Sequence, residues 1–362
     1  MEVVCTNCHQ PYPDVGVPYR CPTCGGIYDY LGVIPFSRVA IQPDQPGIWR
    51  YRETFGLPRE LQPISLGEGN TPLIWDKAFN RSIAFKCEYL NPSGSFKDRG
   101  SATLVGFLRS RQVEVAVEDS SGNAGASFAA YAARAGIKAR VFVPEMAAGP
   151  KRVQISAYGA EVEAVAGPRS NATEAVRREA EHGVVYASHA YLPFNIPGYA
   201  TLAYELLEQL GKAPGTVVLP VGQGGLLLGL LRGFEGLLQA GEIRAIPKMI
   251  GVQARLCAPL WAASSYGLAG LQWVSEGPTK AEGIRVVHPL RGDTLIRAME
   301  VTGGQFLAVE ENDIMNGRDQ LARRGLYVEI TSAVVWNALF QVIGQALDPL
   351  VVVLTGSGLK NP

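Results

Sequence analysis

The chain has 362 residues, of which 47% are hydrophobic and 18% are charged. This composition is enough to bury a large core, and the length predicts two or three domains. Basic and acidic residues number 33 each, so the formal net charge is zero and gives no electrostatic reason to expect nucleic acid or an anionic membrane surface.

The first 30 residues contain four of the six cysteines and no charged-then-apolar leader, so the chain is expected to be cytoplasmic. These cysteines form two Cys-x2-Cys pairs: Cys5, Cys8, Cys21 and Cys24. In a reducing compartment this spacing favours zinc over disulfides. Two pairs complete a tetrahedron, so residues 1–30 are predicted to be a zinc ribbon with a structural ion. Four reduced thiols without a metal are the alternative.

Residues 31–64 are predicted to be a proline-rich connecting arm, after which short valine-rich strands alternate with helices. The expected strands are 83–88, 114–118, 139–144, 161–165, 183–187, 216–220, 249–252 and 350–354. The expected helices are 98–111, 124–135, 150–158, 170–181, 200–210, 226–240, 313–324 and 331–344. This alternation predicts parallel sheets covered by helices. No apolar run reaches the roughly 18 residues of a membrane span.

Ligands of such sheets bind at the loops beyond the carboxyl ends of strands. The first unusual loop, 91–100, contains Lys97 at the start of a helix. The positive end of a helix dipole favours the uncharged amine, which can attack an aldehyde. Phe96 beside it can pack on a planar ring. The alternative is a surface lysine next to a paired Asp98 and Arg99.

The second loop contains Ser120, Ser121 and Asn123 between a strand and an alanine-rich helix. Hydroxyl and N–H groups at a helix start form an anion pocket suited to a carboxylate. An ordinary helix cap is the alternative.

The third loop has consecutive glycines after a strand, which let several N–H groups converge on a phosphate. Its residues are Gly222, Gln223, Gly224, Gly225 and Leu226. Leu227 stands where a dinucleotide loop needs its last glycine, and no Gly-Lys-Ser/Thr follows, so the NAD and P-loop interpretations fail. A turn that only permits close packing is the alternative.

The fourth loop begins with Thr355 after the last valine-rich strand. A hydroxyl there can bond a ring nitrogen without protonating it, whereas the alternative is a strand-ending turn. A lysine, a phosphate cup, a carboxylate pocket and a neutral ring partner together satisfy the needs of pyridoxal 5′-phosphate.

With these motifs the chain resembles the threonine synthases, within the tryptophan synthase β-like (fold type II) pyridoxal-phosphate enzymes. The resemblance runs from end to end and includes residues 67–73, 91–100, 121–123, 222–225, 282–284, 329–333 and 355–360. It implies an α/β fold of two three-layer parallel-sheet domains plus the ribbon. The implied domains are the ribbon at 1–30, the arm at 31–64, a large cofactor-binding domain at 65–97 and 198–362, and a small substrate-loop domain at 98–197.

The resemblance also implies roles for the singled-out residues. Lys97 would be catalytic, forming the Schiff base and moving protons, and Phe96 would flank the ring. Asn123 would bond the ring oxygen O3′, residues 222–226 would hold the phosphate, and Thr355 would meet the pyridine nitrogen. Ser120, Ser121 and Asn123 would frame the substrate carboxylate. A homodimer acting on a small amino acid is expected.

The sequence departs from threonine synthases in two places. Ala124 stands where they usually have threonine. Aligning Gly198 and Thr201 puts Asn195 where their phosphate-binding arginine belongs, and asparagine cannot make the two charged bonds of an arginine. His189 and Tyr191 are therefore expected to line a changed pocket, and His189 and Asn195 to contact the substrate there. A hydrogen-bonded loop histidine is the alternative for His189.

The leading hypothesis is a lyase that converts O-phospho-L-homoserine and water to L-threonine and phosphate. An arginine from elsewhere, such as Arg152, Arg169 or Arg285, would then supply the missing cation. A serine/threonine dehydratase or a β-replacement synthase acting on another small amino acid is the enzymatic alternative. A pyridoxal-phosphate-binding protein without turnover is the alternative from a different class.

Overall fold

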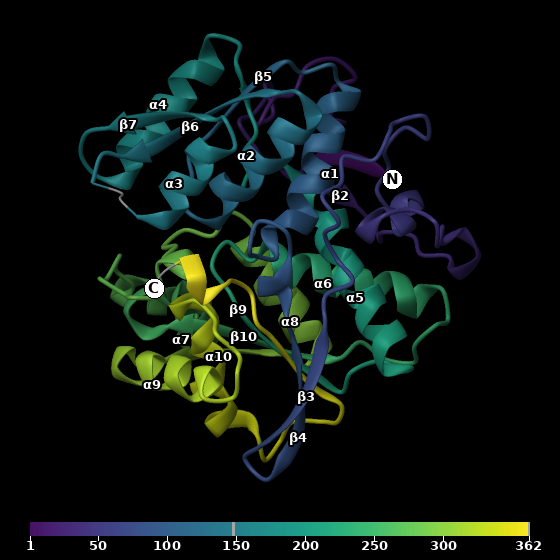
Figure 1. Cartoon of the computed structure of the whole chain (residues 1–362), viewed down its shortest axis with the longest axis vertical. Helices are drawn as coiled ribbons and strands as arrows, with labels where there is room; N and C mark the ends of the chain where they lie inside the picture. The colour runs from purple at the N-terminus through teal and green to yellow at the C-terminus, as the bar shows by residue number, and fades with distance from the viewer. Residues whose placement is uncertain (147–148, 361–362) are drawn as a thin grey trace. The chain divides into compact units, whose positions relative to one another are not determined.

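The computed structural model describes residues 1–146 and 149–360, and Figure 1 shows the chain. It divides into two compact units. Unit 1 comprises Met1–Asn70, Asn91–Ser93 and Lys97–Thr201, and unit 2 comprises Thr71–Leu90, Gly94–Phe96 and Leu202–Pro362. The division differs from the predicted domains because the cysteine segment and the arm pack within unit 1. No helix of the described residues is long and apolar enough to cross a membrane.

The amino-terminal segment of unit 1 is a two-stranded antiparallel ribbon of β1 (Glu2–Cys5) and β2 (Tyr28–Leu31). Each cysteine pair forms a similar turn, since the His9 N–H donates to the Cys5 carbonyl and the Gly25 N–H donates to the Cys21 carbonyl. Gly25 has φ +72°, the left-handed conformation that glycine tolerates best. Each turn brings the two cysteines of its own pair together, and the pairing of β1 with β2 joins the two halves of the ribbon.

The arm is packed rather than loose, and it contains two 3-10 helices, Arg38–Ala40 and Gly47–Thr54. Ile48 and Trp49 are fully buried. Gly47 has φ +52°, and a Cβ added there would lie 2.0 Å from the Glu68 carbonyl oxygen. Only glycine fits this approach, so the arm is held tightly against the segment that carries Glu68.

The sheet of unit 1 is entirely parallel, with strand order β7-β6-β5-β8. Its strands are β5 (Val115–Glu118), β6 (Lys138–Pro144), β7 (Glu161–Val165) and β8 (Val185–Tyr186). Its helices are α1 (Lys97–Ser110), α2 (Asn123–Ala135), α3 (Pro150–Ala157) and α4 (Arg169–Glu181). Helices α2 and α3 connect strands that succeed each other toward the β7 edge, whereas α4 leads back across the sheet from β7 to β8. Since such crossovers are right-handed, α4 lies on the face of the sheet opposite to α2 and α3 (Figure 1).

The sheet of unit 2 has the order β11-β10-β9-β12-β4-β3. Its strands are β3 (Leu73–Ala78), β4 (Arg81–Lys86), β9 (Thr216–Pro220), β10 (Lys248–Ala254), β11 (Gln305–Val309) and β12 (Leu350–Val353). The expectation of wholly parallel sheets is wrong at one edge, where β3 runs antiparallel to β4. The cause is a two-residue turn at Phe79 and Asn80, both with positive φ, which can only reverse the chain.

The remaining helices are α5 (Ile196–Leu210), α6 (Gly225–Gln239), α7 (Pro259–Tyr266), α8 (Gly292–Thr302), α9 (Glu311–Ala322) and α10 (Ile330–Val342). The hydrophobic α10 packs with α9 and the strands in the core of unit 2. All eight expected strands and eight expected helices are present. The strands β7 and β9 have the expected bounds, the other elements have shifted ends, and the strand expected at 183–187 shrinks to two residues. Sequence reasoning missed the ribbon strands, β3, β11, α7 and α8.

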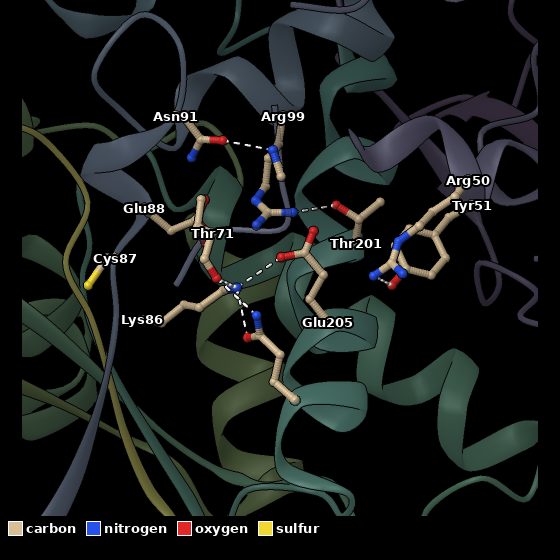
Figure 2. Close-up of polar contacts among 12 residues, drawn as sticks. Arg50, Tyr51, Thr71, Lys86, Cys87, Glu88, Asn91, Arg99, Thr201 and Glu205 are labelled. Atoms are coloured by element: carbon tan, nitrogen blue, oxygen red, sulfur yellow. Dashed lines mark hydrogen bonds and ion pairs between the residues drawn. The ribbon is translucent and has the colours of Figure 1, made fainter. Parts of the chain in front are cut away.

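A buried ion pair fixes the carboxyl end of β4 in unit 2. The Lys86 ammonium lies 2.9 Å from the Glu205 carboxylate, and both side chains are fully buried (Figure 2). Lys86 also donates to the Thr71 carbonyl at 2.7 Å and to the Gln209 side-chain oxygen at 3.0 Å. These bonds satisfy the ammonium, so the pair specifies how α5 docks on β4.

Candidate active site

Lys97 is the first residue of α1, and its side chain is partly buried. Its neighbour Asp98 is fully buried and accepts bonds from the Ser93 N–H and the Ser127 hydroxyl, both at 2.6 Å. Arg99 is also fully buried and donates to the Thr201 hydroxyl at 3.0 Å (Figure 2). Asp98 and Arg99 are therefore interior residues that fix the start of α1, whereas Lys97 itself is only partly buried.

The serine loop, residues 119–123, connects β5 to α2 in unit 1. Gly122 caps α2 and provides no side-chain acceptor for its first N–H groups. A Cβ at Gly125 would lie 1.8 Å from the Ser120 carbonyl oxygen, so the loop lies tightly against the helix. The helix start is therefore suited to a carboxylate, as predicted for Ser120, Ser121 and Asn123.

His189 and Glu118 form a buried pair beside this loop. The imidazole Nδ1 lies 2.6 Å from the Glu118 Oε1, and the Glu118 side chain is 1% exposed. Burial, with the cations of Lys97 and Arg169 nearby, holds the pKa of His189 well below its ordinary value. Burial and the Asp119 carboxylate raise the pKa of Glu118 well above its ordinary value. The imidazole is therefore neutral near pH 7, and the hydrogen bond fixes its orientation.

Asn195 lies one turn after this histidine, on a 3-10 helix of residues Pro193–Asn195. It is 2% exposed, and its amide donates to the His189 carbonyl at 2.6 Å. Its side-chain oxygen is buried and has no hydrogen-bond partner among the described residues. In this structure Asn195 therefore holds the chain at His189.

The glycine loop, residues 221–224, connects β9 to α6 in unit 2. Gly224 caps α6 with φ +81°, and a Cβ there would lie 2.1 Å from Leu295. A Cβ at Gly222 would lie 3.0 Å from the Cα of Ile284. Gln223 uses its side-chain oxygen to accept the Leu290 N–H at 3.2 Å, so the loop offers backbone N–H groups rather than side chains.

Thr355, also in unit 2, has a partner that sequence reasoning did not identify. The Ser332 hydroxyl oxygen accepts the N–H groups of Thr355 and Gly356 and lies 2.8 Å from the Thr355 hydroxyl. With two donors already aimed at it, Ser332 is placed to donate its own hydrogen to Thr355. The Thr355 hydroxyl then keeps its hydrogen for an acceptor such as a pyridine nitrogen.

Phe96 is bound to the Thr355 segment through the backbone. Its N–H donates to the Thr355 carbonyl at 3.0 Å, and the Ser357 N–H donates to the Gly94 carbonyl at 3.0 Å. Residues 94–96 thus lie beside residues 355–357 within unit 2, and Lys97 follows directly in the chain. The backbone therefore joins the Thr355 segment to Phe96, the residue that precedes Lys97.

The four ribbon cysteines form a separate cluster. Their sulfur atoms all lie within 4.8 Å of one another, with Cys5 and Cys24 3.4 Å apart and Cys8 and Cys21 3.6 Å apart. Four thiolates around one zinc ion at about 2.3 Å would have sulfur separations close to these values. The cluster fits a tetrahedral metal ion with no open position.

Residues 64–356 match the family described as pyridoxal-phosphate dependent enzyme, and this chain belongs to that family. It is 33% identical to a threonine synthase of Methanocaldococcus jannaschii, over 99% of this chain and 92% of that protein. It is likewise 33% identical to a threonine synthase of Mycobacterium tuberculosis, over 89% of this chain and 90% of that protein. The chain is therefore a threonine synthase-like enzyme of the lyase class.

Solved structures show the same fold. A T.th. threonine deaminase has a TM-score of 0.64 and 25% identity, covering 79% of this chain and 92% of that chain. A hydrogen sulfide-producing enzyme from Fusobacterium nucleatum has a TM-score of 0.67 and 22% identity, covering 81% of this chain and 95% of that chain.

The residues present fit pyridoxal phosphate. The Thr355 hydroxyl is a neutral group that can donate to a ring nitrogen, and a Cβ at Gly224 in the glycine loop would collide with Leu295. The roles of Lys97 and of the serine and glycine loops stay predictions, and sequence reasoning assigned no role to Ser332 or Glu118. The position of Glu118, directly before the serine loop at the end of β5, is the signal that could have identified it.

Proposed function

We propose that this enzyme converts O-phospho-L-homoserine and water to L-threonine and phosphate. The identity to threonine synthases over nearly the whole chain carries the proposal. When bound, pyridoxal phosphate would supply an electron sink for the charge that develops at the substrate Cα. Lys97 would hold the cofactor and then move protons at Cα and the neighbouring carbon.

Each loop would have a separate task. Residues 222–226 would hold the cofactor phosphate through their backbone N–H groups, and Phe96 would flank the ring. Thr355 would donate to the ring nitrogen, and Asn123 would bond O3′. Ser120 and Ser121, with the start of α2, would bind the substrate carboxylate. His189 would contact the substrate side chain as a neutral group, and Asn195, also predicted to contact substrate, would hold it in place.

A dehydratase acting on serine or threonine is the second candidate. Asn195 offers no cation for a substrate phosphate, and its amide is used by the His189 carbonyl. Arg285 is paired with Glu276 at 3.4 Å, whereas Arg169 is exposed and influences both His189 and Glu118. Arg169 is thus the better source of a phosphate-binding cation for the leading function.

The ribbon would hold structural zinc through Cys5, Cys8, Cys21 and Cys24. The clustered sulfur atoms and the two similar turns support this proposal. Metal analysis of the purified chain tests it, with about one zinc per chain expected and none from a Cys24→Ser variant. A Cys257→Ser variant, which alters a cysteine outside the ribbon, should keep the metal.

We also propose a homodimer in the cytoplasm. Exposed apolar side chains around α7 support an association surface, with Leu268 77% and Trp273 72% exposed. Light scattering on the purified chain, with Trp273→Arg for comparison, tests the assembly. A monomeric wild-type chain would contradict it.

The function is tested by incubating the cofactor-loaded protein with O-phospho-L-homoserine, and in parallel with L-serine, L-threonine and O-phospho-L-serine. Equal amounts of phosphate and L-threonine are expected. Keto acid from serine or threonine alone would establish the dehydratase instead. A Lys97→Ala variant should lose the absorbance band of the lysine Schiff base and all turnover, and a fully active Lys97→Ala protein would refute the catalytic assignment.

A further inference from the structure

The ribbon contacts a particular part of unit 1, the His189 segment, defined here as residues 186–195. The Arg20 guanidinium donates to the Tyr191 hydroxyl at 2.9 Å and lies 4.9 Å from the centre of that ring. The Tyr19 ring lies 5.2 Å from Tyr191 and 5.1 Å from Tyr186. Two consecutive ribbon residues therefore contact the segment around Tyr191.

A second set of contacts joins the ribbon, the His189 segment and α1. The Tyr12 ring meets Phe194 edge-on at 4.9 Å and Phe107 of α1 at 5.8 Å. Phe107 and Phe194 stack on each other with ring centres 3.5 Å apart. Aromatic pairs at these separations stabilise beyond the area they bury. The ribbon thus forms part of the packing that fixes the end of the segment.

The segment itself has little regular structure. Between β8 and α5 it contains a single turn of 3-10 helix, Pro193–Asn195. Its position therefore depends on side-chain contacts, and Tyr191 receives a second charged bond from Arg177 at 2.9 Å. His189 lies two residues before Tyr191, with its imidazole on Glu118 at the end of β5.

The ribbon's own core is small. Its buried apolar cluster consists of Cys5, Cys21 and Tyr28, with Val3, Cys8 and Tyr12 packed against them. So few contacts cannot hold a fold of this size alone, and cysteine ligation of a metal is the usual remedy. Loss of the metal would therefore loosen the residues that contact Tyr191 and Phe194.

We propose that the ribbon is a brace for substrate recognition: Arg20 and Tyr19, held by the metal-bound ribbon, set the position of the His189 segment and so the affinity for the amino acid substrate. Arg20 and Tyr19 are positioning residues, since they act through Tyr191 on His189. The effect on affinity rests on the proposed function, which gives His189 contact with the substrate. The effect of the ribbon on the order of the His189 segment is independent of the proposed function.

The test compares Arg20→Gln and Tyr191→Phe with the wild-type, cofactor-loaded full chain. Arg20→Gln removes one charged bond to Tyr191, and Tyr191→Phe removes both bonds while keeping the ring. Amide hydrogen exchange of residues 187–195 should become about tenfold faster, the scale of one charge-assisted hydrogen bond. KM should rise by a similar factor while kcat changes less than about twofold.

Two comparisons separate bracing from general stability. Arg20→Lys, which keeps the charge, should restore part of the protection and of the KM. Arg59→Gln removes an exposed ion pair with Glu53 in the same unit and should change neither. Stripping the metal from the wild-type chain should speed exchange in residues 187–195 as the Arg20 variant does.

If amide hydrogen exchange in the His189 segment is unchanged in the Arg20→Gln and Tyr191→Phe variants, the proposed brace is wrong. It is also wrong if exchange becomes faster by the same factor throughout unit 1. Unchanged KM with faster exchange would overturn the effect on affinity. If the wild-type chain does not turn over O-phospho-L-homoserine, the proposed function fails, whereas exchange still tests the brace. Binding of L-serine and L-threonine, followed by the cofactor's absorbance, then replaces KM.

Discussion

At the scale of single residues, side-chain chemistry was easier to predict than the partners that tune it. Lys97 and Thr355 were singled out because Lys97 begins a recognisable helix and Thr355 follows a recognisable strand. Ser332, which holds Thr355, is 23 residues away in sequence, and Glu118 is 71 residues from His189. No local pattern encodes such pairs, because only the folded chain brings their atoms within 3 Å.

Glu68 gives a prediction at this scale. It is fully buried and accepts bonds from the Tyr131 hydroxyl at 2.8 Å and the Leu66 N–H at 2.9 Å, but burial raises its pKa to about 7. A raised pKa means that its contribution to stability is fully present below the unfolded value of 4.5 and is lost as pH rises through about 7.

A Glu68→Gln variant should therefore gain stability relative to wild type as pH rises from 5 to 8. The gain should reach at most about 3 kcal/mol, since each pKa unit corresponds to about 1.4 kcal/mol. Urea denaturation of both proteins at pH 5 and pH 8 measures it. A difference in unfolding free energy that is the same at both pH values would contradict the assignment.

At the scale of elements, the alternating pattern located most strands and helices, because period and valine content reflect burial in a parallel sheet. It failed at β3, an exposed edge strand with the charged pair Asp76-Lys77. Edge strands need only one buried face and tolerate charge, so composition conceals them. The antiparallel direction of β3 likewise depends on the turn at Phe79 and Asn80. This turn contains no glycine, the residue that usually marks a positive-φ turn in a sequence.

The turn before α6 gives the prediction at this scale. In Gly224→Ala the new side chain would disfavour the left-handed backbone conformation of this residue, and its Cβ would collide with Leu295. The N–H groups of the glycine loop should therefore be displaced. We expect the affinity for pyridoxal phosphate to fall at least about tenfold. Equilibrium dialysis or absorbance titration measures this.

Gly303→Ala is the matched control, because Gly303 also has positive φ, +65°, but a Cβ there meets nothing within 4 Å. It carries the same backbone strain without the collision, at the end of α8 rather than at the loop. Equal loss of cofactor from both variants would mean that Gly224 matters only for stability.

At the scale of the whole molecule, residues 1–30 were predicted as a domain of their own, and in the structure they belong to unit 1 together with the arm and α1. Its removal should therefore affect more than the first 30 residues. Metal stripping, or Cys24→Ser, should lower the thermal midpoint by roughly 5–10 °C, as expected when a few kcal/mol are lost.

Calorimetry with and without chelator checks this prediction. Chelator should have no further effect on the Cys24→Ser protein, because both treatments remove the same ligand set. A wild-type midpoint that is insensitive to chelator, in a chain shown to release its metal, would mean that the ribbon folds without it.

The sequence by itself determined the α/β class and the spacing of the clustered cysteines, and it singled out the residues that are proposed to bind the cofactor. These follow from short-range signals: periodicity, Cys-x2-Cys spacing and glycines at strand ends. The tertiary structure decided the partners: Ser332 for Thr355, Glu118 and Asn195 for His189, and the ribbon for Tyr191. The physical reason is that a hydrogen bond acts over about 3 Å in space, and the chain must fold before residues far apart in sequence lie within that reach.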